Sequence, residues 1–301
     1  MVIAVTGATG FVGRHVASLL VGRGHAVRAL ARTPRRAATL RSLAITPVLG
    51  DLADPAGLAE LTRGADAVIH LVGIIADAGR ATLESVHVEG TARVVAAARD
   101  ARVGRFVHMS AIGARNEPSA TRYHRTKWQA EQVVVGSGLP HAILRPSLIN
   151  GPESAPIRIL ARLHRWSPAV PLFGDGNFPV QPVWVEDVAS AFALAAERTT
   201  IHGVLEIGGP APLPYREFLL AIGRASGHPR PLVPVPLAVV RAAASLFGIL
   251  GAAAPLTSDQ LQMLVEGSAT PANALEPTFG IRPLPVEAGL RRFLSPAPER
   301  A

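Results

Sequence analysis

The feature that most constrains the fold is a glycine-spaced turn in the first fourteen residues, MVIAVTGATGFVGR. A short β-branched run precedes the turn, and an apolar pattern with helical spacing follows it without a gap. Gly7 permits a tight turn, Gly10 lets the backbone approach a pyrophosphate, and Gly13 lets the helix pack closely on the strand. The pattern therefore predicts a strand, a turn and a helix whose N-terminus binds a dinucleotide.

Short apolar runs alternate with helical patterns from the N-terminus to about Pro146. The predicted strands are Val2–Thr6, Ala26–Ala31, Thr46–Leu49, Ala67–Val72, Arg105–Ser110 and His141–Arg145. The predicted helices are Gly13–Arg23, Arg35–Leu43, Ala56–Arg63, Leu83–Ala101 and Tyr123–Ser137. Strands separated by such helices predict a doubly wound α/β fold, in which a parallel Rossmann sheet is covered on both faces.

Proline becomes frequent after Pro146, which favours loops and irregular segments. A strand at Val180–Val185, a helix at Glu186–Ala196 and a strand at Val204–Ile207 restore the alternation. We therefore predict a dinucleotide-binding domain over residues 1–150, to which residues 180–207 return. Residues 151–301 are expected to form a smaller, mostly helical and discontinuous substrate lobe.

Composition excludes several classes of function. The net charge is +8, but the basic residues are scattered and aromatic residues make up only 5%, so nucleic-acid binding is not expected. The ten histidines form no HExxH or similar cluster, which predicts no metal site, and the absence of cysteine excludes disulfides and thiol catalysis. Because an apolar strand starts at the N-terminus, no cleaved signal is expected and the predicted location is the cytoplasm.

The stretch Leu237–Thr257 is long and apolar. It contains Arg241 and Gly248, and its uncharged part is shorter than the ~20 residues that a membrane span needs. A buried or amphipathic helix is the preferred interpretation, and peripheral contact with a membrane or a quinone-like ligand is the alternative.

Basic residues cluster around the end of the second predicted strand. In a dinucleotide fold this end faces the adenosine ribose, where a carboxylate suits NAD and an arginine suits the 2′-phosphate of NADP. No Asp or Glu precedes Gly50, so the pattern favours NADP(H). Arg32 is the first candidate for the phosphate, followed by Arg28 and Arg14. Arg35 and Arg36 also fit a solvated helix start.

Tyr123 and Lys127 carry the strongest chemical signal. Lys127 is the only lysine in the chain, and one of the two tyrosines stands four residues before it. This spacing places both side chains on the same helical face, where an ammonium lowers the pKa of a phenol. The pair therefore predicts acid–base chemistry beside a nucleotide ribose, which lysine binds as a compact charge. The neighbouring His124 is expected to face solvent, because adjacent helical side chains diverge.

These motifs resemble the short-chain dehydrogenase/reductases. The segments that carry this resemblance are TGATGFVG at the start, Tyr123-x-x-x-Lys127, Asp51-Leu52, His70-Leu71-Val72-Gly73, Glu89-Gly90-Thr91, Phe106–Ser110 and Arg145-Pro146. Two later segments, Pro182–Ala189 and Ile207–Pro210, are similar to the extended and atypical branches, and above all to the group that contains the nucleotide-binding accessory subunit of respiratory complex I and its bacterial relatives. The resemblance covers nearly the whole chain.

The resemblance implies that Tyr123 donates or accepts a proton, while Lys127 holds the nicotinamide ribose and lowers the tyrosine pKa. It also implies a hydroxyl after the fifth strand. Ser110 is the candidate, because Ala111 and Ile112 stand where that hydroxyl is usual. His87 replaces a frequent asparagine. Together with the glycine turn, the matches give the expected cofactor-binding residues: Gly7, Thr9, Gly10, Phe11, Val12, Gly13, Arg32, Asp51, Leu52, Leu71, Val72, Gly73, Met109, Ser110, Tyr123, Lys127, Arg145 and Pro146.

Asp51 follows the third predicted strand, where the chain would pass an adenine ring. Its carboxylate can accept from the exocyclic amine, although an aspartate in a turn is also common for local reasons. The leading hypothesis is an NADP(H)-dependent oxidoreductase that acts on an unknown small carbonyl, alcohol or activated double bond. The alternatives are a non-catalytic NADPH-binding structural or sensor protein and a nucleotide-sugar epimerase or dehydratase.

Overall fold

The computed structural model describes residues 1–248 and 257–295. The chain divides into two compact units, each built from separate segments. Unit 1 comprises Met1–Pro146, Glu186–Ile207 and Ala272–Ile281, and unit 2 comprises Ser147–Val185, Gly208–Pro271 and Arg282–Ala301.

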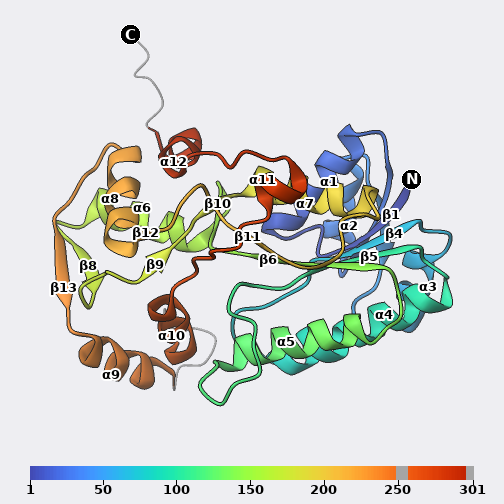
Figure 1. The fold of residues 1–301 in the computed structure, drawn as a ribbon, viewed down its shortest axis with the longest axis horizontal. Helices are drawn as coiled ribbons and strands as arrows, with labels where there is room; N and C mark the ends of the chain where they lie inside the picture. The colour runs from blue at the N-terminus through green and yellow to red at the C-terminus, as the bar shows by residue number, and fades with distance from the viewer. Residues whose placement is uncertain (249–256, 296–301) are drawn as a thin grey trace, which may run out of the picture. The chain divides into compact units, whose positions relative to one another are not determined.

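A seven-stranded sheet forms the centre of unit 1 (Figure 1). Its order is β11-β6-β5-β4-β1-β2-β3, and all six neighbouring pairs are parallel. The strands are β1 (Val2–Thr6), β2 (Ala26–Ala31), β3 (Thr46–Leu49), β4 (Ala67–His70), β5 (Arg105–Met109), β6 (His141–Pro146) and β11 (Gly203–Ile207). The strand order reverses between β1 and β4, and ligands of such sheets bind outside the carboxyl ends of the strands at that point.

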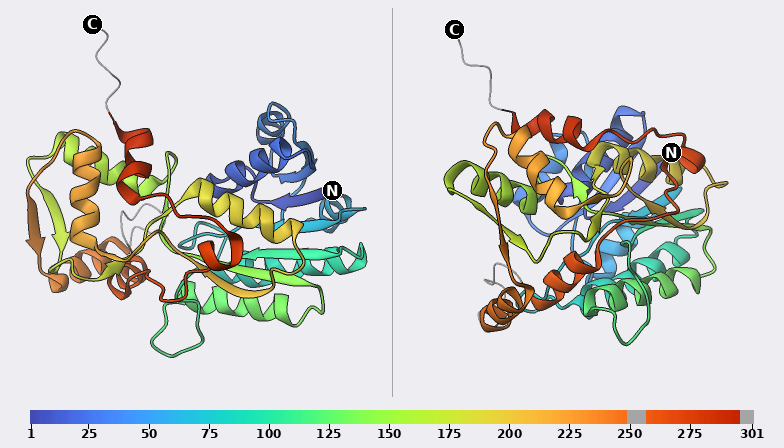
Figure 2. Two further views of the ribbon diagram at one scale, coloured as in Figure 1. Left: turned by 45° about the horizontal axis from the view of Figure 1, so that its top comes forward. Right: turned by 60° about the vertical axis from the view of Figure 1, so that its left-hand side comes forward.

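Helices cover both faces of this sheet, which confirms the predicted doubly wound α/β fold. Figure 1 shows α1, α2 and α7 on one face, and Figures 1 and 2 show α4 and α5 packed side by side on the other. The helices of unit 1 are α1 (Phe11–Gly22), α2 (Pro34–Arg41), α3 (Pro55–Thr62), the π-helix η1 (Glu84–Glu89), α4 (Gly90–Asp100), α5 (Arg122–Val135), α7 (Val185–Glu197) and α11 (Leu275–Phe279).

The central strands are apolar because both of their faces are buried. Ile3, Ala4 and Val5 of β1 have no exposed surface. On the face that α3 and α4 cover, β-strand side chains such as Val68 and Phe106 pack against Leu61 and Val94 in one core cluster. This core fixes the carboxyl ends of β1, β4 and β5, where most of the candidate site residues lie.

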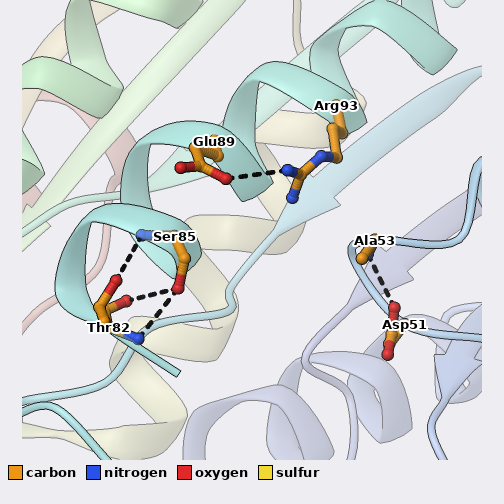
Figure 3. A network of polar contacts seen from close by, with 6 residues as sticks. All are labelled: Asp51, Ala53, Thr82, Ser85, Glu89 and Arg93. Atoms are coloured by element: carbon orange, nitrogen blue, oxygen red, sulfur yellow. Dashed lines mark hydrogen bonds and ion pairs between the residues drawn. The ribbon is translucent and has the colours of Figure 1, made fainter. Parts of the chain in front are cut away.

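One predicted helix of unit 1 differs in type from the observed one. The segment predicted as a helix over Leu83–Ala101 begins with the π-helical turn η1 and continues as α4. Its start is fixed by a reciprocal pair, in which the Thr82 amide donates to Ser85 Oγ (2.9 Å) and the Ser85 amide donates to Thr82 Oγ1 (3.0 Å), as Figure 3 shows. The spacing of apolar residues does not distinguish a π-helical turn from an α-helical one, so the sequence did not predict it. Such turns are often found at functional sites.

Unit 2 is built on one helical core with short strand pairs. Ile157, Phe218, Leu219 and Leu290 are buried together in it. Its elements are β7 (Ile149–Asn150), α6 (Ala155–Trp166), β8 (Val170–Phe173), β9 (Pro179–Val180), β10 (Val183–Trp184), β12 (Leu213–Pro214), α8 (Tyr215–Ala225), β13 (Leu232–Val235), α9 (Leu237–Gly248), α10 (Ser258–Glu266) and α12 (Val286–Leu294).

The prediction of one strand at Val180–Val185 that returns to the main sheet is wrong. Two short strands stand there, and β9 pairs with β12 while β10 pairs with β7. Pro182 lies between them and has no amide to continue a ladder. Conversely, residues 272–281 join unit 1, where the Ala274 amide donates to the Glu206 carbonyl of β11 (2.8 Å), a placement that their sequence did not predict.

The apolar stretch Leu237–Thr257 is helical over α9, and its residues 249–256 lie outside the described residues. Over the described parts of the chain, no helix has the length and apolar character of a membrane span.

Candidate active site

The glycine turn after β1 has the geometry of a phosphate cradle. Gly7 has φ +81°, a conformation that side chains disfavour. A Cβ on Gly13 would overlap the Gly7 carbonyl oxygen, so the close approach of α1 to the turn requires glycine there. At the N-terminus of α1, Gly10 provides no side-chain cap and the first turn carries no carboxylate. The first-turn amides therefore remain available for an anionic group, as a dinucleotide requires.

The segment after β4 joins this turn to Lys127, a predicted site residue. A Cβ on Gly7 would lie 3.1 Å from the Val72 amide nitrogen, and a Cβ on Gly73 would lie 3.0 Å from Lys127 Nζ. The Leu71 amide donates to the Thr6 carbonyl (3.1 Å), which ties this segment to β1. The glycine turn, residues 71–73 and Lys127 thus form one continuous surface at the point where the strand order reverses.

The arginines of the basic cluster have different environments. Arg32 is the first residue after β2 and is exposed. Arg14 and Arg36 line one hollow of about 950 Å³ together with Thr9. Arg28, the second phosphate candidate, has main-chain partners, because its Nη1 donates to the Glu60 carbonyl (2.8 Å) and the Arg63 carbonyl (2.9 Å) at the end of α3.

Asp51 has a local structural partner. Its Oδ1 accepts from the Ala53 amide (2.7 Å), a turn contact that Figure 3 shows. Leu52 packs against Gly90 at the start of α4, where a Cβ would meet Leu52 Cδ1 at 2.7 Å. On the adjacent turn Glu89 and Arg93 form an i,i+4 ion pair of 2.8 Å. The place of Asp51 and Leu52 at an adenine ring remains a prediction.

Tyr123 and Lys127 lie on one face of α5, as their spacing predicts. The helix is capped by Thr121, whose Oγ1 accepts from the His124 amide (3.2 Å), so that Tyr123 falls in its first turn. Lys127 Nζ lies 6.0 Å from the centroid of the Tyr123 ring and donates to the Met109 carbonyl (3.0 Å) at the end of β5. The ammonium is therefore held at the carboxyl edge of the sheet beside the phenol.

Burial shifts both members of this pair toward their neutral forms. Desolvation lowers the pKa of Lys127 to about 8, and the nearby Glu131 carboxylate opposes the shift. Desolvation also raises the pKa of Tyr123 to about 12. A phenol this weakly acidic needs an adjacent positive charge to release its proton near neutral pH, and Lys127 is positioned to supply it.

Glu131 and Arg145 form the next layer behind Lys127. The Arg145 guanidinium makes a two-pronged ion pair with the Glu131 carboxylate (2.6 and 2.7 Å), and Glu206 of β11 lies 3.6 Å from it. Glu131 is buried and stands one turn after Lys127 on the same face of α5. The i+4 spacing could have singled out Glu131 from the sequence, but its partnership with the predicted site residue Arg145 depends on the fold.

His87 links η1 to the first turn of α5. Its Nε2 accepts from the Ile74 amide (3.2 Å), so Nδ1 carries the proton and donates to Thr126 Oγ1 (2.9 Å). The Thr126 hydroxyl donates in turn to the Tyr123 carbonyl (3.1 Å). The His87 ring also packs edge-on against the Tyr123 ring, with centroids 5.5 Å apart. Burial, followed by the charge of Lys127, lowers the pKa of His87 to about 2, so the ring is neutral.

A second set of buried histidines lies within the sheet. His70 Nδ1 is 2.6 Å from Thr6 Oγ1, and its Nε2 is 3.1 Å from Thr91 Oγ1. His108, opposite His70 on β5, stacks on it with ring centroids 5.4 Å apart. Burial holds the pKa of both histidines well below the ordinary value, that of His70 at about 3. Both rings are neutral core residues.

Ser110 follows β5 and is only 3% exposed. Its buried Oγ has no hydrogen-bond partner among the described residues. Ala111 and Ile112 follow it, half-buried, and the Ile112 amide donates to the carbonyl of the buried Pro146 (3.2 Å). The enclosed hydroxyl weakens the case for Ser110 as a direct contact to a substrate.

The expectation that His124 faces solvent is wrong. The ring is 5% exposed because the loop after β5 covers it. Gly113, at φ +88°, lies directly over the ring, where a Cβ would come within 2.8 Å of His124 Nε2. Within the described residues, no group of three or more histidine and acidic side chains could hold a metal ion.

Comparison with known proteins identifies the family. A family model described as NAD(P)H-binding matches residues 7–168. The chain belongs to this NAD(P)H-binding family. A ketoreductase of Stigmatella aurantiaca, named for 4-hydroxy-2-methyl-3-oxo-4-farnesyl-3,4-dihydroquinoline-1-oxide, is 32% identical over 267 residues, which cover 80% of this chain and 78% of that protein. The resemblance stated for the motifs is thereby confirmed.

Two further similarities bear on the alternatives. The mitochondrial NADH dehydrogenase (ubiquinone) 1 alpha subcomplex subunit 9 of Arabidopsis thaliana is 28% identical over 293 residues, which cover 92% of this chain and 72% of that protein. The structure of UDP-glucuronic acid 4-epimerase from Bacillus cereus, in complex with UDP-glucuronic acid and NAD, has a TM-score of 0.75 at 18% identity and covers 98% of this chain and 99% of that one. The second similarity shows a shared fold.

Proposed function

We propose that this NAD(P)H-binding protein is an NADP(H)-dependent oxidoreductase that transfers hydride to or from a small carbonyl, alcohol or activated double bond. The observation that carries the proposal is the Tyr123–Lys127 pair, which lies next to residues 71–73 and hence to the glycine turn. The name of the Stigmatella ketoreductase favours a carbonyl among these substrates.

The bound dinucleotide would supply or accept the hydride. In the direction of reduction, the substrate carbon gains the hydride and its oxygen gains a proton from the Tyr123 hydroxyl. Lys127 stabilises the resulting phenolate, and a proton from solvent restores the phenol. The ion pair of Glu131 and Arg145 lies behind the Lys127 ammonium and keeps the Glu131 carboxylate in place. The hydrogen bonds from His87 to Thr126 and from Thr126 to the Tyr123 carbonyl fix the helical turn that carries the phenol.

The preference for NADP(H) rests on Arg32, supported by Arg14 and Arg36, which line the hollow that also contains Thr9 of the glycine turn, and by the absence of any carboxylate before Gly50. We expect NADPH to bind at least tenfold more tightly than NADH, a difference that Arg32→Ala removes because the 2′-phosphate loses its guanidinium partner. Titration of the purified protein with both dinucleotides measures this. Arg41→Ala, at an exposed arginine in the last turn of α2, is the matched control. Equal affinity of the wild type for both would contradict the assignment.

The role of Tyr123 is tested by Tyr123→Phe. We expect turnover of NADPH with a panel of ketones and aldehydes to fall by about 10²–10⁴-fold, because the proton donor is lost. Dinucleotide affinity should stay within threefold. Tyr215→Phe, at the only other tyrosine, is buried in unit 2 and should leave turnover unchanged. Full activity of Tyr123→Phe would contradict the proposed acid–base role.

A second candidate function is a non-catalytic NADPH-binding protein. Two observations favour it: the Ser110 hydroxyl is enclosed, and Ala111 and Ile112 offer no replacement. The similarity to a subunit of NADH dehydrogenase is in line with such a role. The same panel separates the two functions, since a binding protein would bind NADPH tightly and turn over no substrate, with or without Tyr123.

A further inference from the structure

A cationic and aromatic surface covers the exposed side of α6 in unit 2. Arg158, Arg162 and Arg165 recur at helical spacing and form one exposed stripe. Ile159 and Trp166, seven residues apart, lie beside this stripe and are 55% and 75% exposed. We call these five residues the α6 surface. A tryptophan this exposed on an ordered helix is unusual, because its large apolar ring gains by leaving water.

The α6 surface is not a misplaced core face. The opposite side of the helix already packs in unit 2, where Ile157 and His164 are fully buried. The helix contains no acidic residue, and within the described parts of the chain no carboxylate pairs with its three arginines. The Arg165 guanidinium instead lies 5.0 Å from the Trp166 ring centroid. The positive charge of the stripe is thus directed to solvent.

A hollow of about 560 Å³ adjoins the α6 surface. All three arginines and Trp166 line it, together with Phe293 and Leu294 from the end of α12. No described acidic residue lines it. A lining that combines guanidinium groups with apolar side chains suits a phosphate group that is attached to an apolar chain.

We propose that the α6 surface binds the face of an anionic lipid bilayer. Arginines meet lipid phosphates, and an indole prefers the boundary between headgroups and acyl chains. The hollow, which the same arginines line, would accept a headgroup phosphate. An acidic protein partner would also satisfy the arginines, and exposed tryptophan and arginine occur together at protein interfaces as well. We favour a membrane because the stripe of three arginines lies beside two exposed apolar side chains and a hollow that the same arginines line.

Co-sedimentation of the whole protein with vesicles tests this. We expect binding to vesicles of phosphatidylcholine with 30% phosphatidylglycerol, weak binding to phosphatidylcholine alone, and weakening as salt rises. Each basic residue near an anionic leaflet contributes roughly fivefold, so Arg158→Glu/Arg162→Glu should weaken binding by at least about 25-fold. Trp166→Ala should weaken it about tenfold, since an apolar anchor is lost. Wild-type tryptophan emission should shift to the blue with anionic vesicles.

Matched variants control for net charge and for lost apolar surface. Arg99→Glu/Arg198→Glu reverses two exposed arginines of unit 1, and Val204→Ala shortens an exposed apolar side chain there. Both should bind vesicles like the wild type. The proposal would be overturned if the wild type bound no vesicles, or if it bound acidic proteins but no vesicles. Equal losses of binding in the test and control variants would also overturn it.

Discussion

At the scale of the residue, the buried Lys127 lowers the stability of the fold, whatever its proposed role in the reaction. The ammonium is 2% exposed, and desolvation lowers its pKa from 10.5 to about 8, a difference worth about 3 kcal/mol. Below pH 8 Lys127 is protonated in both the folded and the unfolded chain, so the folded state bears the full cost of burying the ammonium. Between pH 8 and 10.5 the unfolded chain binds more protons, so stability rises with pH.

We therefore predict that Lys127→Met is more stable than the wild type by about 1–2 kcal/mol at pH 7, after allowing for the lost hydrogen bond to Met109. The variant should also lose the rise in stability between pH 8 and 9.5, and should turn over no substrate. Urea unfolding at pH 7 and 9.5 measures this. Arg99→Met, which removes an exposed helix cation, should keep the wild-type rise. A variant less stable at pH 7 would contradict the prediction.

The sequence predicted those residue features that depend on local spacing. Tyr123 and Lys127 share a helical face wherever the helix lies, so four residues of separation sufficed. His124 was placed in solvent because only its neighbours on α5 were considered, whereas Gly113 in the loop that precedes α5 buries it. Arg28 was a phosphate candidate because of its place near the end of β2. Its contacts with the carbonyls at the end of α3 exist only in the folded chain, so the sequence could not show them.

At the scale of the element, α1 offers a matched pair of glycines. A Cβ on Gly13 would overlap backbone atoms of Gly7 and Ala8, which cannot yield as a side chain can. Gly13→Ala should therefore cost about 3 kcal/mol or more of unfolding free energy and abolish dinucleotide binding. Gly22→Ala, in the last turn of the same helix, meets nothing within 4 Å and should stabilise by about 0.5–1 kcal/mol. Urea unfolding and dinucleotide titration test both, and equal effects of the two would refute the packing argument.

Helices and strands could be predicted from the sequence where their apolar periodicity extends over enough residues. The strands of the main sheet and the helices between them carry four or more residues of consistent pattern, and the doubly wound fold follows from their alternation. The two-residue strands β9 and β10 are too short to show a period, and the six residues of η1 cover little more than one turn. Their form depends on contacts, such as the pair between Thr82 and Ser85 and the break at Pro182.

At the scale of the whole molecule, buried neutral histidines make the fold sensitive to acid. Burial first, and the charge of Lys127 after it, hold the pKa of His70 at about 3 and that of His87 at about 2, and His108 is lowered likewise. Unfolded histidines titrate near 6.5. As pH falls below 6.5 the unfolded chain alone takes up these protons, so the folded state loses stability.

Three such groups remove at most about 4 kcal/mol of unfolding free energy per pH unit, enough to unfold a domain of ordinary stability near pH 4. We predict a steep fall in the urea midpoint between pH 6 and pH 5. His108→Leu should reduce the slope by about one proton, because this ring lacks a hydrogen-bond partner among the described residues and an apolar side chain can replace it. His202→Leu, at an exposed histidine, should keep the wild-type slope. If stability is flat down to pH 5, His70, His87 and His108 are charged in the folded protein, which would contradict their neutral state.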